Sequence, residues 1–125
     1  MKPRHNLVRL KQFQVSEKRR QLAQLDLMIA EFDRMAVELD TQIALDEKKA
    51  GITDVNHFAY PTFAKAARQR RDNLRNSQID LAQQKEAAQI ALDEAEQELA
   101  KAEMLESRDG RGREAGEEPR QAMHG

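Results

Sequence analysis

Histidines, serines and carboxylates are the residues of this chain whose chemistry would support catalysis or metal binding. The three histidines, His5, His57 and His124, lie on separate segments, and their spacing matches no metal-ligand motif. The sequence has no glycine-rich phosphate loop and no serine in a recognisable nucleophile context. The carboxylates are spread along the chain, as they are on solvated helix faces. We therefore expect no enzyme activity, no bound metal and no cofactor.

Aromatic side chains, in contrast, gather in one short stretch of the sequence. Three of the five aromatic residues, Phe58, Tyr60 and Phe63, fall within six positions. Aromatic residues are enriched at the energetic centres of protein interfaces, so we expect these three to form a partner-binding surface with Arg68 as its polar rim. The alternative is that Phe58 and Phe63 only seal the ends of the neighbouring helices.

A basic cluster begins just after these aromatics. It consists of Lys65, Arg68, Arg70, Arg71 and Arg75. Such a cluster is compatible with nucleic-acid binding, but no stacking aromatic side chains are interleaved with it, and the acidic stretch 21–47 matches its charge. We expect no nucleic-acid partner.

Composition indicates what kind of scaffold carries these residues. Charged residues make up 34% of the 125 positions, aromatic residues only 4%, and there is no cysteine. This composition is typical of long helices, and the missing cysteines exclude disulfides and thiolate metal sites. Because no apolar run reaches the length of a signal peptide or a membrane span, we expect a cytoplasmic protein.

The strongest pattern in the sequence is a repeat of apolar residues between positions 22 and 43. Its members are Leu22, Leu25, Ile29, Phe32, Ala36, Leu39 and Ile43. The spacing alternates between three and four without a slip, which predicts the seam of a coiled-coil helix and not a strand. The seam extends back to Val8, and a smaller, more polar seam runs from Ala67 to Ala102.

Signals of helix ends divide the chain into four segments. We expect a first helix over about 3–50, because Gly51 follows Lys48 and Lys49 as a C-cap glycine would. The segment 51–60 breaks the repeat and forms the loop, and Pro61 is well placed to open a second helix over 61–107. Three glycines and a proline among charges predict that 108–125 is a disordered tail.

Three apolar residues near the N-terminal end lie outside the seam. Leu7, Leu10 and Phe13 are either a partner surface or part of a wider stripe covered by the second helix.

The seams and the charges both indicate that the two helices are antiparallel. If Ile43 faces Ala67, then Val15 faces Ala95 and Val8 faces Ala102, so large side chains meet small ones. Residues 1–20 carry seven basic residues and one acidic residue, whereas 90–109 carry seven acidic and two basic. Residues 21–47 carry seven acidic and one basic, whereas 63–89 carry six basic and three acidic. An antiparallel hairpin opposes these blocks favourably, and flanking charges select orientation in coiled coils. The predicted fold is therefore all-α, an antiparallel two-helix coiled-coil hairpin over 1–107 with a disordered C-terminal tail.

Two segments resemble the FliJ family of flagellar export proteins, particularly its alphaproteobacterial members. They are Leu7-Val-Arg-Leu-Lys-Gln-Phe-Gln-Val-Ser-Glu-Lys-Arg-Arg-Gln-Leu22 and His57-Phe-Ala-Tyr-Pro-Thr-Phe-Ala-Lys-Ala-Ala-Arg-Gln-Arg-Arg-Asp-Asn-Leu74. The resemblance covers about residues 1–107, and the second segment is the more specific one. It implies a cytoplasmic component of the flagellar type III protein export apparatus, associated peripherally with that apparatus at the inner membrane.

The implied partners are the flagellar export ATPase, the cytosolic domain of the export gate, and export chaperones. The resemblance implies a stalk that docks in the ATPase ring. We assign ATPase coupling to the region of Leu7, Leu10 and Phe13, and export-gate binding to the loop. The alternative function is a generic coiled-coil scaffold or spacer without ATPase coupling.

Overall fold

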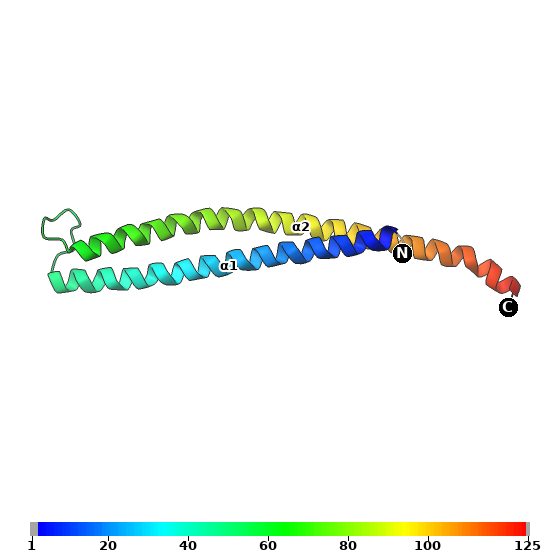
Figure 1. Cartoon of the computed structure of the whole chain (residues 1–125), viewed down its shortest axis with the longest axis horizontal. Coiled ribbons are helices and arrows are strands. Elements are labelled where there is room, and N and C mark those ends of the chain that lie inside the picture. Colours follow the sequence, from blue (N-terminus) through cyan, green and yellow to red (C-terminus); the bar gives the residue numbers. More distant parts are fainter. Residues whose placement is uncertain (1–2, 125) are drawn as a thin grey trace. The chain divides into compact units, whose positions relative to one another are not determined.

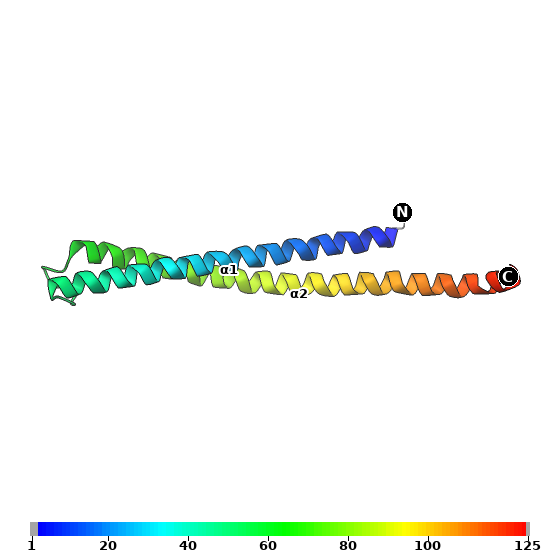
Figure 2. The same cartoon turned by 90° about the horizontal axis from the view of Figure 1, so that it is seen from below.

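The structure, a computed structural model, describes the backbone of residues 3–124 and the side chains of residues 6–110. It contains two α-helices, α1 (Pro3–Ala50) and α2 (Thr62–His124), joined by a loop. Within each of the two compact units described below, a stretch of α1 and a stretch of α2 run side by side in opposite directions (Figure 1 and Figure 2). No strand occurs in the described backbone, so the predicted all-α, antiparallel two-helix coiled-coil hairpin is confirmed. Neither helix has, within the described residues, an apolar stretch long enough to cross a membrane.

The predicted seam of α1 is the face that this helix buries. Ala36 is fully buried, and Ile43, Val15 and Val8 are buried with exposed fractions of 3%, 3% and 7%. The remaining seam positions between them are half-buried, and their neighbours on the outer face are exposed. Side chains spaced alternately by three and four lie on one stripe of a helix, and this stripe must pack against a partner to leave water.

The seam of α2 is buried in the same way, with small or polar residues at many of its positions. Ala67, Leu81 and Ala102 are buried. Gln78 satisfies its side-chain amide by donating a hydrogen bond to the main-chain carbonyl of Ile29 over 3.1 Å. Lys85, another polar residue of this seam, is 47% exposed, and its ammonium pairs with Asp26.

The chain divides into two compact units, each made of a stretch of α1 and a stretch of α2. The first unit combines Met1–Leu22 with Ala88–Gly125. Its core is a cluster of Val15, Leu92 and Ala95, against which Leu22 and Leu99 pack. The predicted facing of Val15 and Ala95 is therefore confirmed. Ion pairs between the described side chains join the helices here, among them Lys11–Glu98 at 2.9 Å and Arg19–Glu96 at 3.7 Å, as the opposed charge blocks predicted.

The second unit, Ala23–Ala87, contains the loop. Four carboxylates of α1, each seven residues after the last, form ion pairs with basic residues of α2. The pairs are Asp26–Lys85 at 2.7 Å, Asp33–Arg75 at 2.8 Å, Asp40–Arg71 at 2.9 Å and Glu47–Arg68 at 3.0 Å. As the residue numbers of the carboxylates increase along α1, those of their partners decrease along α2. This order is the one that antiparallel helices produce. Because exposed pairs contribute little individually, their main effect is to disfavour the opposite orientation.

Both helix ends at the loop follow from local residue types. Gly51 has φ of 69°, the left-handed conformation that glycine adopts freely, and its N–H donates to the Glu47 carbonyl over 2.9 Å. The predicted C-cap glycine is confirmed. Pro61 lies one residue before the first helical residue, and its carbonyl accepts the first helical hydrogen bond, from the N–H of Lys65. The predicted helix start at Pro61 is thus shifted by one position.

The C-terminal end of α2 differs from the sequence-based expectation. We predicted an end near residue 107, whereas α2 continues to His124. Each glycine in a helix costs only about 1 kcal/mol relative to alanine, so Gly110 and Gly112 weaken the helix without ending it, and the glutamate, arginine and alanine residues around them are strong helix formers. The side chains of 111–125 lie outside the described residues, and the disorder that we expected for 108–125 stays a prediction.

Candidate partner-binding surfaces

Local hydrogen bonds shape the loop between α1 and α2. The side chain of Asp54 accepts a hydrogen bond from the Asn56 N–H over 2.9 Å, and its carbonyl accepts one from the His57 N–H over 3.1 Å. His57 repeats this arrangement: its Nδ1 accepts from the Ala59 N–H, and its carbonyl accepts from the Tyr60 N–H, both over 3.0 Å. These side chains supply acceptors that the loop backbone would otherwise lack. The loop therefore has a defined conformation that can present side chains.

Tyr60 closes the end of the coiled coil. Its side chain is buried, with 7% exposed. Its hydroxyl donates to Oε2 of Glu47 over 2.8 Å and accepts from Nε of Arg68 over 2.8 Å. Arg68 also donates to Oε2 of Glu47 over 3.0 Å, so the three side chains form a closed hydrogen-bonded triad. The Tyr60 hydroxyl, followed by the Arg68 guanidinium, holds the pKa of the Glu47 carboxyl below its usual value.

The triad corrects two of the assignments made from the sequence. Tyr60 is not available as a contact surface, because it lies against the ends of both helices. Arg68 does not form a free polar rim, because Tyr60 and Glu47 bind its guanidinium. The competing explanation, in which Phe58 and Phe63 seal the helix ends, is also wrong: these side chains are 97% and 64% exposed. The seal is Tyr60.

Phe58 and Phe63 are the aromatic side chains that the loop unit leaves to solvent. The Phe58 ring stacks on the His57 ring, with centroids 4.7 Å apart and planes inclined by 22°. A nearly fully exposed phenylalanine contributes little to the stability of its own chain. The exposed pair His57–Phe58 therefore offers a flat apolar surface with few rotatable bonds, which is inexpensive to order on binding. The partner-binding role of Phe58 and Phe63 stays a prediction.

The off-seam residues of α1 are also exposed. Leu7, Leu10 and Phe13 have exposed fractions of 36%, 50% and 62%. The alternative of a wider stripe covered by α2 is therefore wrong for Leu10 and Phe13. Both side chains lie on the outer face of α1, where a partner can reach them.

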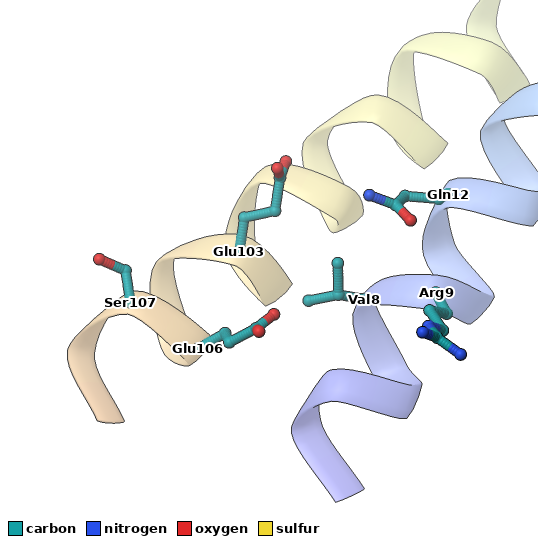
Figure 3. Close-up of a pocket in the computed structure, with 6 residues that line it drawn as sticks. All are labelled: Val8, Arg9, Gln12, Glu103, Glu106 and Ser107. Atoms are coloured by element: carbon teal, nitrogen blue, oxygen red, sulfur yellow. The ribbon is translucent and has the colours of Figure 1, made fainter. Parts of the chain in front are cut away.

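A groove between the two helices lies near these residues, within the first unit. Its lining consists of Val8, Arg9, Gln12, Glu103, Glu106 and Ser107. Val8 lies between the helices at the base of the groove, the Glu106 carboxylate points toward it, and Arg9 points away from α2 (Figure 3).

The basic cluster of α2 is largely paired within the molecule. Arg68, Arg71 and Arg75 each bind a carboxylate of α1. The side chains of Lys65 and Arg70 have no hydrogen bond or ion pair to any residue whose side chain the structure describes. The cluster therefore presents two available cations and not five.

Metal chemistry finds no support among the described residues. They contain no group of three or more histidine, cysteine, aspartate or glutamate side chains placed to hold an ion. His57 is engaged with the Ala59 N–H and with the Phe58 ring, and His5 and His124 lie outside the described side chains.

The fold and these surfaces define the class of protein: an antiparallel coiled-coil hairpin with exposed apolar side chains on its loop and on the outer face of α1. Comparison with protein-family models, with curated proteins and with solved structures finds no match for this chain.

Sequence reasoning missed one functional feature that the sequence does contain. The sequence analysis assigned no role to Glu47. It is the last of four carboxylates spaced by seven residues, of which Asp26 is the first. Such a repeat places all four on one flank of the seam. That signal would have predicted an ion pair at the end of α1, and hence the anchoring of Arg68.

Proposed function

We propose that this protein is a FliJ-like component of the flagellar type III protein export apparatus. In this role it acts as a stalk and adaptor between the export ATPase ring, the membrane export gate and export chaperones. The protein acts by binding and has no catalytic residues of its own. Its place is in the cytoplasm, attached to the membrane only through its partners.

One observation carries the proposal. The segment 57–74 resembles the FliJ family most specifically. It contains two exposed aromatic side chains, Phe58 and Phe63, beside a buried, hydrogen-bonded Tyr60. A spacer has no need of a fully exposed phenylalanine on a rigidly capped loop. The antiparallel coiled-coil hairpin is also the architecture that the resemblance implies.

Two surfaces divide the binding work in this proposal. Phe58 of the loop and Phe63 of the first turn of α2 contact the cytosolic domain of the export gate. The outer face of α1 with Leu7, Leu10 and Phe13 contacts the ATPase ring. Both surfaces are exposed, so neither has to unfold in order to bind.

A double-variant experiment separates these roles. Purified chain is tested against the flagellar export ATPase and against the cytosolic domain of the export gate, with binding measured by calorimetry and ATP turnover measured in parallel. Phe58→Ala with Phe63→Ala should lose the gate and keep the ATPase, whereas Leu10→Ala with Phe13→Ala should do the reverse. Both double variants should keep the wild-type melting curve, because all four side chains are at least half exposed.

The alternative function, a coiled-coil spacer, makes a different prediction for the same assay. A spacer binds neither protein and leaves ATP turnover unchanged. If the wild-type chain behaves in this way, the export proposal is wrong.

A further inference from the structure

The two flanks of the coiled-coil seam in the loop unit are chemically different. In coiled-coil notation they are the e and g positions on either side of the buried a and d residues. The e flank of α1 carries Asp26, Asp33, Asp40 and Glu47, and each of these carboxylates pairs with a basic residue of α2. This flank is closed by ion pairs along its whole length.

The opposite flank, here called the groove flank, has no carboxylate at its g positions. These are Met28, Met35, Gln42 and Lys49 on α1, and Phe63, Arg70, Ser77 and Gln84 on α2. Two adjoining grooves lie along it. The first is lined by Phe32, Met35, Arg70, Asn73, Leu74 and Ser77, and the second by Met35, Glu38, Leu39, Gln42 and Arg70. Met28 and Phe63 are 45% and 64% exposed, so the flank presents apolar area to solvent.

Arg70 is the shared wall of the two grooves and the exceptional residue of this flank. Every neighbouring arginine of α2 binds a carboxylate, whereas Arg70 has no hydrogen bond or ion pair with any residue whose side chain is described. Glu38, which lines the second groove, is already bound by Arg34 over 2.9 Å. The Arg70 guanidinium is exposed to solvent beside the apolar side chains of Phe32, Met35 and Leu74. It is suited to a carboxylate from another molecule, because Arg binds carboxylates through two parallel hydrogen bonds.

We propose that the groove flank binds an amphipathic helix of a partner protein whose apolar stripe carries one carboxylate, and that this carboxylate pairs with Arg70. Helices commonly bind in grooves through apolar side chains spaced by three and four, and methionine side chains adapt to the shape of such a helix. From Met28 to Gln42 the flank spans about 21 Å at 1.5 Å per residue, which accommodates about four helical turns. The groove flank and its ligand class do not depend on the export assignment.

The residue types favour this occupant over two others. A second copy of this chain would present its own groove flank, whose g positions hold no carboxylate, so Arg70 would remain unpaired in a symmetric dimer. Nucleic acid requires several available cations along a surface, whereas the g positions of this flank hold two basic residues, Arg70 and, at the loop end of α1, Lys49.

Three synthetic peptides test the proposal. Each is a helix of about 14 residues, the length of the flank, with the same leucine and methionine stripe, and the central stripe position holds glutamate, glutamine or lysine. Binding to the full-length chain is followed by fluorescence anisotropy. The glutamate peptide should bind about tenfold more tightly than the lysine peptide, the size expected for one charge-assisted pair. Arg70→Glu should reverse that preference.

Two matched controls make the result specific to the flank. Lys65→Glu reverses another exposed, unpaired charge of α2 and should leave the preference unchanged. Met35→Glu should abolish binding of the glutamate peptide, whereas Val37→Glu, on the outer face of α1, should not. Circular dichroism should give the wild-type helix content for all four variants.

Several results would overturn the proposal. They are equal affinity for the three peptides, no binding of any peptide to the wild-type chain, and a preference that persists in Arg70→Glu. Concentration-dependent dimerisation that Met35→Glu abolishes would also overturn it, because the occupant would then be a second copy of this chain.

Discussion

The hydroxyl of Tyr60 donates a hydrogen bond to the carboxylate of Glu47 across 2.8 Å and thirteen residues of sequence. It joins the end of the loop to the last turn of α1, and Arg68 joins both to the first turns of α2. One buried side chain thus ties together the three segments that meet at the closed end of the coiled coil. Phe58, two residues earlier, is 97% exposed and takes no part in this arrangement.

Truncation of Tyr60 and truncation of Phe58 should therefore have very different effects on the free energy of unfolding. Tyr60→Ala removes a buried ring and should lower the free energy of unfolding by about 3 kcal/mol. Phe58→Ala removes a ring that is 97% exposed and should change it by less than about 0.5 kcal/mol. Urea unfolding followed by circular dichroism measures both. Equal losses would mean that Phe58 packs in the folded loop.

The triad also predicts a dependence of stability on acidity. The Tyr60 hydroxyl and Arg68 lower the pKa of Glu47 below its ordinary 4.5. The folded state therefore holds the Glu47 proton less tightly than the unfolded chain does. The stabilisation is fully present above pH 4.5 and is lost as the pH falls through the lower folded-state pKa.

Glu47→Gln provides the measurement for that dependence. Melting temperatures of the wild type should fall in the acid range below pH 4.5 more steeply than those of the variant. At neutral pH the variant should melt at a lower temperature than the wild type, because its amide cannot replace the charge. Parallel acid profiles for the two proteins would show that Glu47 has the same pKa in both states.

Two glycines should respond in opposite directions to the same substitution. Gly51→Ala places a Cβ in a left-handed conformation with φ of 69° and should destabilise the fold by about 1 kcal/mol. Gly110→Ala lies within α2 and should stabilise the helix by about 0.5 kcal/mol. A Cβ atom added at either glycine would have no neighbouring atom within 4 Å. The two substitutions are therefore equally free of steric clashes and differ only in the backbone conformation of the glycine. Chemical denaturation of both variants provides the comparison, and a stabilised Gly51→Ala would contradict the cap.

Adjacent residues of α1 test the seam itself. Ala36 is fully buried and Val37 is 49% exposed. Ala36→Leu adds methylenes where the helices are in contact and should lower the free energy of unfolding by about 2 kcal/mol. Val37→Leu adds one methylene on the outer face and should change it by less than about 0.5 kcal/mol. Thermal and urea melts of the pair measure the difference, and a neutral Ala36→Leu would place the seam on another face.

The sequence alone was sufficient for the helices, their buried faces and their orientation. The spacing of Leu22 to Ile43, Gly51 as a cap and the opposed charge blocks are all repeated or local signals. Helix geometry converts such signals directly into a stripe, an end and an alignment, so no long-range information is needed. The extension of α2 beyond residue 107 was missed, because glycine weakens a helix without forbidding it.

Only the tertiary structure decided which of the clustered residues are available to a partner. Phe58, Tyr60 and Phe63 look alike in the sequence, yet Tyr60 is buried because a carboxylate and a guanidinium from two different helices meet its hydroxyl. Arg68 and Arg70 are likewise indistinguishable in composition. They differ because two positions along a helix is a rotation of about 200°, which places Arg68 on the flank with carboxylates and Arg70 on the flank without them. Whether a side chain is free to bind a partner depends on which side chains lie opposite it on the other helix. The residue types near it in the sequence do not contain that information.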